Sequence, residues 1–534
     1  DSNAVQESIF AAISRQGQNL FAVGDVKQSI YRFRLADPGI FLEKYLTYPD
    51  AAQAEEGKPR RVLLSQNFRS RREILDATNF IFRSVMSEEM GELDYGADEQ
   101  LYFGAAYYLP RTDTQTEFHL VSVVDTDEER FDRTRTEAQF VARRIRKMLE
   151  EGYPVQDGDA LRPCRPEDFA ILMRSPKSRL KAFTAALRHL DIPCSSAESG
   201  GFFDTVEIAV IWSFLQIIDN PRQDVPLISV LRSPLFGFTA DKLAEIRALQ
   251  KDGDFYEALL LDESEETAKF LAVLQQLRQS AKEESAETLL WRLYDVTQAL
   301  AVFGAMPDGE ERRNNLLALH AYVQQLGASE KKSLFTFTGH LRRLLEEDHA
   351  PDLSTQQNGG GVQILSIHKS KGLEYPIVIL CDLHKAFNRE DLKRPVLVHS
   401  KLGLGTERVE TERHIRYDTI SKMALARQLE RETKAEELRL LYVAMTRARE
   451  KLILVQCMKK AQKHLQDLSA VSSCPVSPEA VGDARCMGDW VLLPLLQTPE
   501  AECLRQYAEI ENVETVSSDG GWQVFVEENP VGEE

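Results

Sequence analysis

Cysteine is scarce in this sequence, and its spacing matches no metal-binding or disulfide pattern. The seven cysteines are odd in number, and no two of them form a Cys-x-x-Cys pair. Structural zinc sites and small secreted scaffolds both rely on paired cysteines. We therefore expect no disulfide framework and no metal site, and we interpret the thiols as those of a reduced, cytosolic protein.

Long apolar runs are absent as well. A membrane-spanning helix needs roughly 20 apolar residues, and the longest candidate, residues 208–218, is interrupted by Ser213 and Gln216. The sequence shows no secretory signal. We therefore expect neither a membrane span nor secretion, and a cytoplasmic location.

The sequence also lacks a Gly-x-x-x-x-Gly-Lys-[Ser/Thr] loop, the common cradle for nucleotide phosphates. It begins at Asp1 without an initiator methionine. We therefore expect the chain to be an internal part of a longer protein.

The composition that is present is that of a folded protein with several domains. At 534 residues the chain exceeds one typical domain of about 100–200 residues. Apolar residues make up 43% and charged residues 28%, which argues against long disorder. The net charge of −19 disfavours a protein that coats nucleic acid with its whole surface. A local cluster of Lys and Arg would still suffice for a phosphate-binding face.

Strand-like and helix-like segments alternate in the first two hundred residues. Four apolar runs predict buried strands, and two stretches with apolar residues three to four positions apart predict helices. The runs cover residues 20–23, 61–64, 118–124 and 169–173, and the stretches cover residues 38–46 and 137–150. Strands that alternate with helices predict an α/β fold with a parallel sheet.

The pattern becomes helical from residue 206 to residue 348 and breaks at a glycine-rich segment, residues 357–361. Strands are predicted again after the break, with one long helix before the last of them. These strands cover residues 362–366, 377–380 and 452–455, and the helix covers residues 411–448. We therefore expect an all-helical domain inserted into the α/β domain. After residue 456 only residues 490–496 and 522–526 have a structured pattern.

The first segment with a chemical signature is residues 23–34, Val-Gly-Asp-Val-Lys-Gln-Ser-Ile-Tyr-Arg-Phe-Arg. Gln28 at the end of an expected strand can orient a water or a phosphate oxygen. Tyr31 and Phe33 beside Arg34 combine stacking with phosphate contact, which suits single-stranded nucleic acid. Taken alone, the segment is explained better by a structural role, with Tyr31 and Phe33 as core aromatics and Gln28 as a turn cap, than by a functional one.

The second segment is residues 64–72, Leu-Ser-Gln-Asn-Phe-Arg-Ser-Arg-Arg. It places Arg69 and two further arginines after an expected strand, where a helix begins. The guanidinium fork matches phosphate geometry. A solvated basic turn is the alternative.

The third segment is residues 362–376, with the loop Ser-Ile-His-Lys-Ser-Lys-Gly-Leu-Glu after a strand. Backbone amides and hydroxyls at such a turn can grip a phosphate backbone, and Gly372 permits a close approach. Ser366, His368 and Glu374 are its candidate site residues. An ordinary polar loop is an equal alternative.

The fourth segment is residues 437–450, Glu-Leu-Arg-Leu-Leu-Tyr-Val-Ala-Met-Thr-Arg-Ala-Arg-Glu. Arg447 at the end of a helix has the place of an arginine finger, which stabilises charge on a transferred phosphoryl group. The alternative is an amphipathic helix with solvated arginines. For Arg449 this alternative is at least as well supported as a phosphate contact.

Together and in this order, the four segments resemble motifs III, IV, V and VI of superfamily 1A helicases of the UvrD/RecB type. The wording is closest to the AddA group of bacterial helicase–nucleases, with the RecB group next. UvrD and PcrA more often carry Trp at the position of Phe33 and Phe at the position of Tyr375. The resemblance covers residues 1–456.

The resemblance implies roles for the matching residues. Gln28 would sense the γ-phosphate of ATP, Arg69 and Arg447 would reach that phosphate, and Glu374 would touch the ribose. The residues that would contact single-stranded DNA are Tyr31, Phe33, Arg34, Ser366 and His368.

The resemblance also divides the chain into RecA-like motor domains. Residues 1–64 would end the first domain, 1A. Residues 65–205 and 362–456 would form the second domain, 2A, and residues 206–361 its helical insertion, 2B. Residues 457–534 would lead towards a nuclease domain.

The resemblance implies an ATP-dependent DNA helicase with exonuclease activity that acts in double-strand break repair and recombination. ATP and Mg²⁺ would be its cofactors, DNA ends its substrate, and an AddB-like subunit its partner in a heterodimer. The phosphate-binding loop, the acidic pair of motif II and the nuclease are expected outside this chain. The chain alone is therefore expected to bind neither ATP nor Mg²⁺ tightly and to be inactive. Two alternatives stay open: a UvrD/PcrA-like repair helicase without a nuclease, and a nonenzymatic DNA- or partner-binding module.

Overall fold

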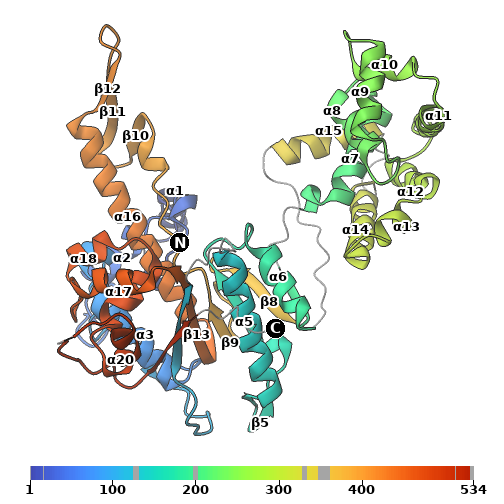
Figure 1. The fold of residues 1–534 in the computed structure, drawn as a ribbon. Helices are drawn as coiled ribbons and strands as arrows, with labels where there is room; N and C mark the ends of the chain where they lie inside the picture. Colours follow the sequence, from blue (N-terminus) through green and yellow to red (C-terminus); the bar gives the residue numbers. More distant parts are fainter. Residues whose placement is uncertain are drawn as a thin grey trace. The chain divides into compact units, whose positions relative to one another are not determined.

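The computed structural model describes residues 2–15, 17, 19–123, 132–196, 202–327, 334–346, 361–511 and 513–528. The chain forms two compact units (Figure 1). The sheet unit comprises residues 1–197 and 359–534, and the helical unit comprises residues 198–358. The assignment of these residues to domains 1A, 2A and 2B stays a prediction.

A seven-stranded sheet, in the order β14-β3-β13-β9-β6-β8-β7, forms the core of the sheet unit. Every neighbouring pair in it is parallel, which confirms the predicted α/β class. The strands are β3 (Thr116–Val123), β6 (Phe169–Met173), β7 (Cys194–Ser196), β8 (Val362–Ser366), β9 (Tyr375–Leu380), β13 (Ala448–Lys459) and β14 (Trp522–Glu528).

Helices cover both faces of this sheet, which explains why β6 and β9 in its middle are apolar runs without polar alternation, whereas the edge strands β7 and β14 are only partly buried. In β6, Ile171 packs with one set of helices and Leu172 with the other, because successive side chains point to opposite faces. The first set is α5 (Arg133–Glu151) and α6 (Leu180–His189); the second is α3 (Arg72–Val85), α16 (Ile420–Met445) and α19 (Met487–Leu495).

Shorter elements complete the sheet unit. The helices are α1 (Ala4–Ile13), η1 (Val26–Gln28), η2 (Arg32–Arg34), α2 (Gly39–Thr47), α4 (Glu88–Gly91), η3 (Pro166–Asp168), η5 (Asp391–Lys393), α17 (Ala461–Ser469), α18 (Pro478–Asp483), η6 (Pro499–Ala501) and α20 (Glu502–Tyr507). The small sheets are β1 (Gln66–Asn67) with β2 (Tyr102–Phe103), β4 (Pro154–Asp157) with β5 (Ala160–Pro163), and β10 (Val396–His399) with β11 (Gly403–Glu410) and β12 (Ile415–Asp418).

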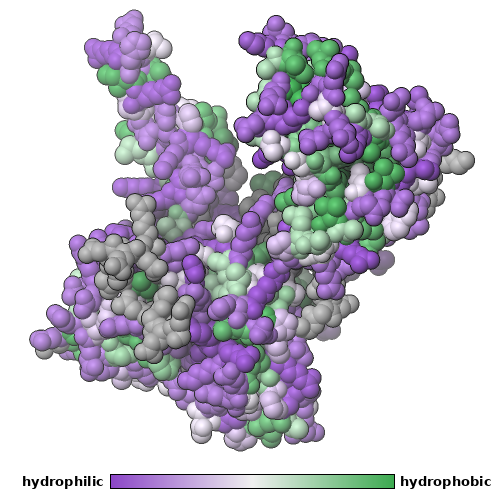
Figure 2. All heavy atoms as spheres, turned by 45° about the vertical axis from the view of Figure 1, so that its right-hand side comes forward, coloured by the Kyte–Doolittle hydropathy of each residue, from purple (hydrophilic) through white to green (hydrophobic). Residues whose placement is uncertain are grey.

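The helical unit contains helices and no strand in its described residues, as predicted for this stretch. Ser264 and Ser285 start two of the helices by accepting a hydrogen bond from the backbone of the third helical residue. Apolar patches lie among the hydrophilic surface of this unit (Figure 2). The helices are η4 (Phe202–Asp204), α7 (Val206–Asp219), α8 (Asp224–Arg232), α9 (Ala240–Leu249), α10 (Phe255–Leu260), α11 (Glu265–Ser280), α12 (Ala286–Thr297), α13 (Ala299–Gly304), α14 (Gly309–Gly327) and α15 (Leu334–Glu346). No helix in the described part of the chain is long and apolar enough to cross a membrane.

Two predicted strands near the amino terminus are wrong. Residues 20–23 and 61–64 are irregular and exposed, with Phe21 at 89% and Val62 at 66% of full exposure. A strand exists through the hydrogen bonds of a neighbour, and no described strand lies beside either run. Their apolar side chains therefore face outward.

The predicted helix over residues 411–448 begins later, at Ile420, where Thr419 caps it. Residues 403–418 form the hairpin of β11 and β12 instead, with His414 in the left-handed conformation at its turn. The carboxyl-terminal stretch is also more ordered than its pattern indicated. It contributes β14 and four α-helices that pack into the core, among them α17, α18 and α20.

Candidate functional site

The segment around Gln28 forms two short 3-10 turns that dock on α16. The guanidinium of Arg439 donates to the backbone oxygen of Ser29 at 2.8 Å, and Glu436 accepts from the backbone nitrogen of Arg32 at 2.9 Å. The Gln28 amide donates to Asp25 at 2.9 Å. Its side chain is therefore held at the turn by a neighbouring carboxylate.

The turn that carries Arg69 lies between β1 and α3. The Asn67 side chain accepts hydrogen bonds from the backbone nitrogens of Arg69 and Ser70, at 2.8 and 3.0 Å. Such a local cap fixes the turn where the helix starts. The Arg69 side chain donates to Glu374 at 2.6 Å, so the structure joins two of the predicted site residues directly.

Arg447 directly precedes β13 and is 2% exposed. Its guanidinium folds back and donates to the backbone oxygens of Val443 and Leu373, at 2.9 and 3.1 Å. It therefore does not project freely from the helix end. Burial and the neighbouring Arg69 lower the pKa of Arg447 to about 10.

Further cations surround this pair of arginines. Burial and the charge of Arg447 lower the pKa of Lys371. A guanidinium nitrogen of Arg449 lies 3.7 Å from a Glu374 oxygen. The structure thus gathers four cations beside two carboxylates, Glu374 and the nearby Asp25, an arrangement suited to an anion with several negative oxygens. We call Arg69, Lys371, Glu374, Arg447 and Arg449 the arginine cluster.

The predicted DNA-contacting residues also meet. The Tyr31 hydroxyl donates to the backbone oxygen of His368 at 3.4 Å, and the two rings lie 6.2 Å apart. The Arg34 guanidinium lies 5.4 Å and the Lys371 ammonium 5.1 Å from the Tyr31 ring centre. Ser366 accepts from the backbone of Lys369 at the foot of the same loop. The side chain of Phe33 lies outside the described residues.

Sequence reasoning missed a cleft of about 590 Å³ beside this loop. Its lining includes Arg174 and Ser175, which follow β6, Asp382 and Lys385, which follow β9, and Glu437, which pairs with Arg174 at 2.8 Å. The backbone nitrogen of Ile367 donates to Met173 at 3.0 Å, so the cleft adjoins the His368 loop. Polar residues directly after two buried strands were the available signal, because ligand crevices form at the carboxyl ends of parallel strands.

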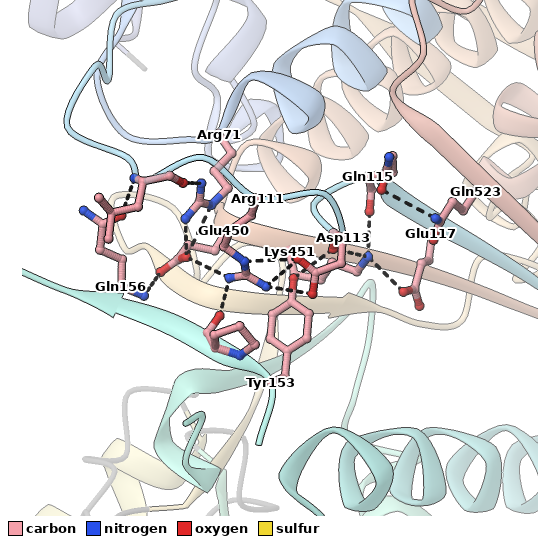
Figure 3. Close-up of polar contacts among 12 residues, drawn as sticks. Arg71, Arg111, Asp113, Gln115, Glu117, Tyr153, Gln156, Glu450, Lys451 and Gln523 are labelled. Atoms are coloured by element: carbon pink, nitrogen blue, oxygen red, sulfur yellow. Dashed lines mark hydrogen bonds and ion pairs between the residues drawn. The ribbon is translucent and has the colours of Figure 1, made fainter. Parts of the chain in front are cut away.

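A buried polar network behind the Arg69 turn was missed as well (Figure 3). Glu450, 1% exposed, accepts from the Arg71 guanidinium at 3.0 Å and from the backbone nitrogen of Gln156 at 2.7 Å. Lys451 pairs with Glu117 at 2.9 Å. Three consecutive charged residues, Arg449 to Lys451, at the start of a largely apolar strand were the signal that could have revealed it.

Two family models match the chain. The model of the UvrD-like helicase C-terminal domain matches residues 62–459, and that of the UvrD/REP helicase N-terminal domain matches residues 1–49. This chain belongs to the UvrD-like helicase family. The first match includes the whole seven-stranded sheet except β14, together with the helical unit.

Curated relatives of this UvrD-like chain are described as subunits of an ATP-dependent helicase/nuclease. The protein of Clostridium novyi (strain NT) is 38% identical over 98% of this chain and 46% of its own length. Those of Bacillus cereus (strain B4264) and Bacillus anthracis are 36% and 37% identical over 98% of this chain and 44% of their own lengths. The chain thus spans less than half the length of the curated relatives it matches.

Proposed function

We propose that this chain is the C-terminal motor portion of an ATP-dependent DNA helicase–exonuclease subunit. In this proposal the whole enzyme couples ATP hydrolysis to movement along single-stranded DNA and to duplex unwinding, in double-strand break repair and recombination. Similarity to helicase/nuclease subunits along nearly the full chain supports it. The arginine cluster is the observation that carries it.

The arginine cluster fits the γ-phosphate of ATP. Arg69 lies close enough to Arg447 to disfavour the charge of Arg447, and phosphate oxygens between them would relieve that repulsion. Gln28 would orient the attacking water or the phosphate, and Glu374 would turn from Arg69 to the ribose. Arg447, held by two backbone carbonyls, would enter the reaction already oriented.

The same residues do not fit Mg²⁺. In the described ranges, no group of three His, Cys, Asp or Glu side chains could hold a metal ion, and the cluster is predominantly cationic. The metal and the remaining phosphate contacts would come from the phosphate-binding loop and the acidic pair of the longer protein. The chain alone would therefore bind ATP and Mg²⁺ weakly and would not hydrolyse ATP.

DNA would lie along the carboxyl ends of β6, β8 and β9. Tyr31 and Phe33 would stack on bases, and Arg34, Ser366, His368 and the cleft beside them would contact the backbone. Arg69 and Arg447 would close on the triphosphate and draw the two motor domains together, and hydrolysis would let them separate. If the two motor domains bind the single DNA strand tightly in alternation, this motion would move the enzyme along the strand in steps.

The proposal extends to partners and location. DNA ends would be the substrate, an AddB-like subunit would complete a heterodimer, and the enzyme would work in the bacterial cytoplasm. A UvrD-like repair helicase without a nuclease is the nearest alternative.

The isolated chain and the full-length subunit together test this function. The chain should bind a single-stranded oligonucleotide, while releasing neither phosphate from ATP nor acid-soluble nucleotides from DNA in the presence of Mg²⁺. The full-length subunit should do all three. DNA-stimulated ATP hydrolysis by the isolated chain, lost in Arg447→Ala, would refute the proposed division of labour. DNA binding by a full-length subunit that never hydrolyses ATP would favour a nonenzymatic module.

A further inference from the structure

Residues 104–111, which we call the tyrosine loop, wrap around the turn that carries Arg69. The Tyr107 hydroxyl donates to the backbone oxygen of Phe68 at 2.9 Å, and the Tyr108 hydroxyl donates to that of Arg69 at 2.6 Å. A Cβ atom at Gly104 would lie 2.8 Å from the Phe68 ring. A side chain at position 104 would therefore displace the exposed Phe68 ring, so glycine allows the close approach of the loop to the turn.

The tyrosine loop is itself anchored to the buried network around Glu450 (Figure 3). The Arg71 guanidinium donates to the backbone oxygen of Leu109 at 2.9 Å and pairs with Glu450 at 3.0 Å. Its central carbon lies 4.4 Å from the centre of the Tyr108 ring. The Gln156 side chain accepts from the backbone nitrogen of Leu109 at 2.9 Å, while its own backbone donates to Glu450. The loop thus has a rigid base.

Further hydrogen bonds connect the Arg69 turn with the turn that carries Arg447. The Ser70 hydroxyl donates to the backbone oxygen of Ala448 at 2.7 Å, and the backbone nitrogen of Arg71 donates to that of Arg449 at 2.8 Å. The Tyr108 side chain also lies beside that of Arg449 and, against the effect of burial, raises the pKa of that guanidinium. Tyr108 therefore lies against both turns at once.

We propose that Tyr108 is a positioning residue that holds the Arg69 turn in register with the Arg447 turn. This inference rests on the proposed function, in which both arginines contact one phosphate. Two cations that act on a single transferred group must keep a fixed separation, and a displacement of about 1 Å can lower a rate by about 100-fold. Neither tyrosine belongs to the four motif segments, so the geometry alone points to them.

A matched control exists in the same unit. The Tyr153 hydroxyl also donates to a backbone oxygen, that of Asp113, at 3.2 Å, and its ring lies 4.6 Å from the Arg111 guanidinium carbon. It resembles Tyr108 in both contacts, its hydroxyl acts on Asp113 outside the tyrosine loop and the Arg69 turn, and phenylalanine keeps the ring that packs on Arg111. Tyr153→Phe therefore reports the general effect of removing such a hydroxyl.

The test compares ATP hydrolysis by the full-length wild type with that by its Tyr108→Phe and Tyr153→Phe variants, with active sites titrated. Tyr108→Phe should lower kcat about tenfold and change KM for ATP less than about twofold, because the lost alignment matters in the transition state. Tyr153→Phe should keep kcat within about twofold of the wild type. In an Arg69→Ala background, Tyr108→Phe should have no further effect, because it acts through Arg69. Equal kcat for the two phenylalanine variants, or an additive effect with Arg69→Ala, would overturn the inference.

Two further measurements keep the test decisive. Ser70→Ala removes another side-chain contact between the turns and should also lower kcat selectively. It replaces Tyr108→Phe if that variant does not fold, and an unchanged kcat in it then overturns the inference. In the isolated chain, amide hydrogen exchange over residues 67–71 should accelerate in Tyr108→Phe and not in Tyr153→Phe. If the full-length wild type shows no DNA-stimulated ATPase, the proposed function fails, and this exchange experiment decides by itself whether Tyr108 holds the turn.

Discussion

The Nε atom of Arg69 lies 2.6 Å from a carboxylate oxygen of Glu374, although the two residues are 305 positions apart in the chain. Both are predicted to contact the nucleotide, Arg69 at the γ-phosphate and Glu374 at the ribose. In the structure, this ion pair holds the Arg69 guanidinium within the arginine cluster. A nucleotide would have to compete with Glu374 for Arg69.

This relationship predicts the effect of neutralising Glu374. Glu374→Gln removes one of the two negative charges that act on the arginine cluster, the other being Asp25, so the isolated chain should bind inorganic tripolyphosphate about two- to tenfold more tightly at low salt. Titration calorimetry measures the affinity. Asp391→Asn, at an exposed carboxylate in η5, is the control and should leave it unchanged. Weaker binding by Glu374→Gln would contradict the role of the cluster as an anion site.

The buried network predicts a large loss of stability from one substitution. Glu450→Ala leaves Arg71 and Arg111, each with a 5% exposed side chain, without their shared carboxylate. Breaking a buried pair in this way typically costs about 3–5 kcal/mol of unfolding free energy. Glu150→Ala breaks the exposed pair with Arg146 and should cost less than about 0.5 kcal/mol. Urea unfolding of the isolated chain, monitored by a signal from the sheet unit, compares the unfolding free energies of the two variants. Similar losses in both would contradict the structural role of the buried network.

The pair of Glu137 and Asp382 predicts a pH dependence of stability. Burial, reinforced by the nearby Asp382 and opposed by Arg179 and Arg133, raises the pKa of Glu137 to about 8. The folded state therefore holds this proton more strongly than the unfolded state does. Its contribution is complete below pH 4.5 and is lost as the pH rises towards 8.

Glu137→Gln removes this titration and keeps an acceptor for the backbone of Asp382. Between about pH 5 and about pH 8, the unfolding free energy of the wild type should fall relative to that of Glu137→Gln, by about 1–3 kcal/mol. Denaturant unfolding at several pH values checks this. A difference that does not change with pH would show that Glu137 titrates normally.

Stacking at Tyr31 predicts a loss of DNA affinity. Tyr31→Ala should weaken binding of a single-stranded oligonucleotide to the isolated chain by about 1–3 kcal/mol, the usual value for one base–aromatic stack. Tyr417→Ala removes an equally aromatic, 46% exposed side chain from β12 and should have no effect. Fluorescence anisotropy at fixed salt measures both. Equal affinities for the two variants would remove Tyr31 from the DNA site.

The sequence predicted the five inner strands of the central sheet well because they are largely buried and apolar, whereas the edge strand β7, Cys-Ser-Ser, is half-buried, has no apolar run and was not predicted. Residues 169–173 form β6 with the predicted bounds. The same signal failed for residues 20–23 and 61–64, because an apolar run specifies a strand only where a neighbour accepts its hydrogen bonds. The β11–β12 hairpin was missed because its alternating side chains are mostly exposed and produce no apolar face.

Four motif segments were visible in the sequence, but not the residues that hold them together. The contact between Arg69 and Glu374 joins two motifs and follows from the fold. Tyr108 and Glu450 act through backbone carbonyls and buried charges, for which a single sequence has no periodic signal. Their roles depend on partners about 40 to more than 370 positions away and become apparent only in three dimensions.

DNA-stimulated ATP hydrolysis by the full-length subunit, with and without Arg447, tests the central claim most directly. Arg447→Ala should lower kcat by about 10³–10⁵, the range typical of an arginine that stabilises phosphoryl transfer, while binding of single-stranded DNA stays within about twofold of the wild type. Arg416→Ala, at an exposed arginine of β12, should match the wild type in both measurements. If Arg447→Ala hydrolyses ATP as fast as the wild type, the arginine cluster is not the phosphate-sensing part of a motor.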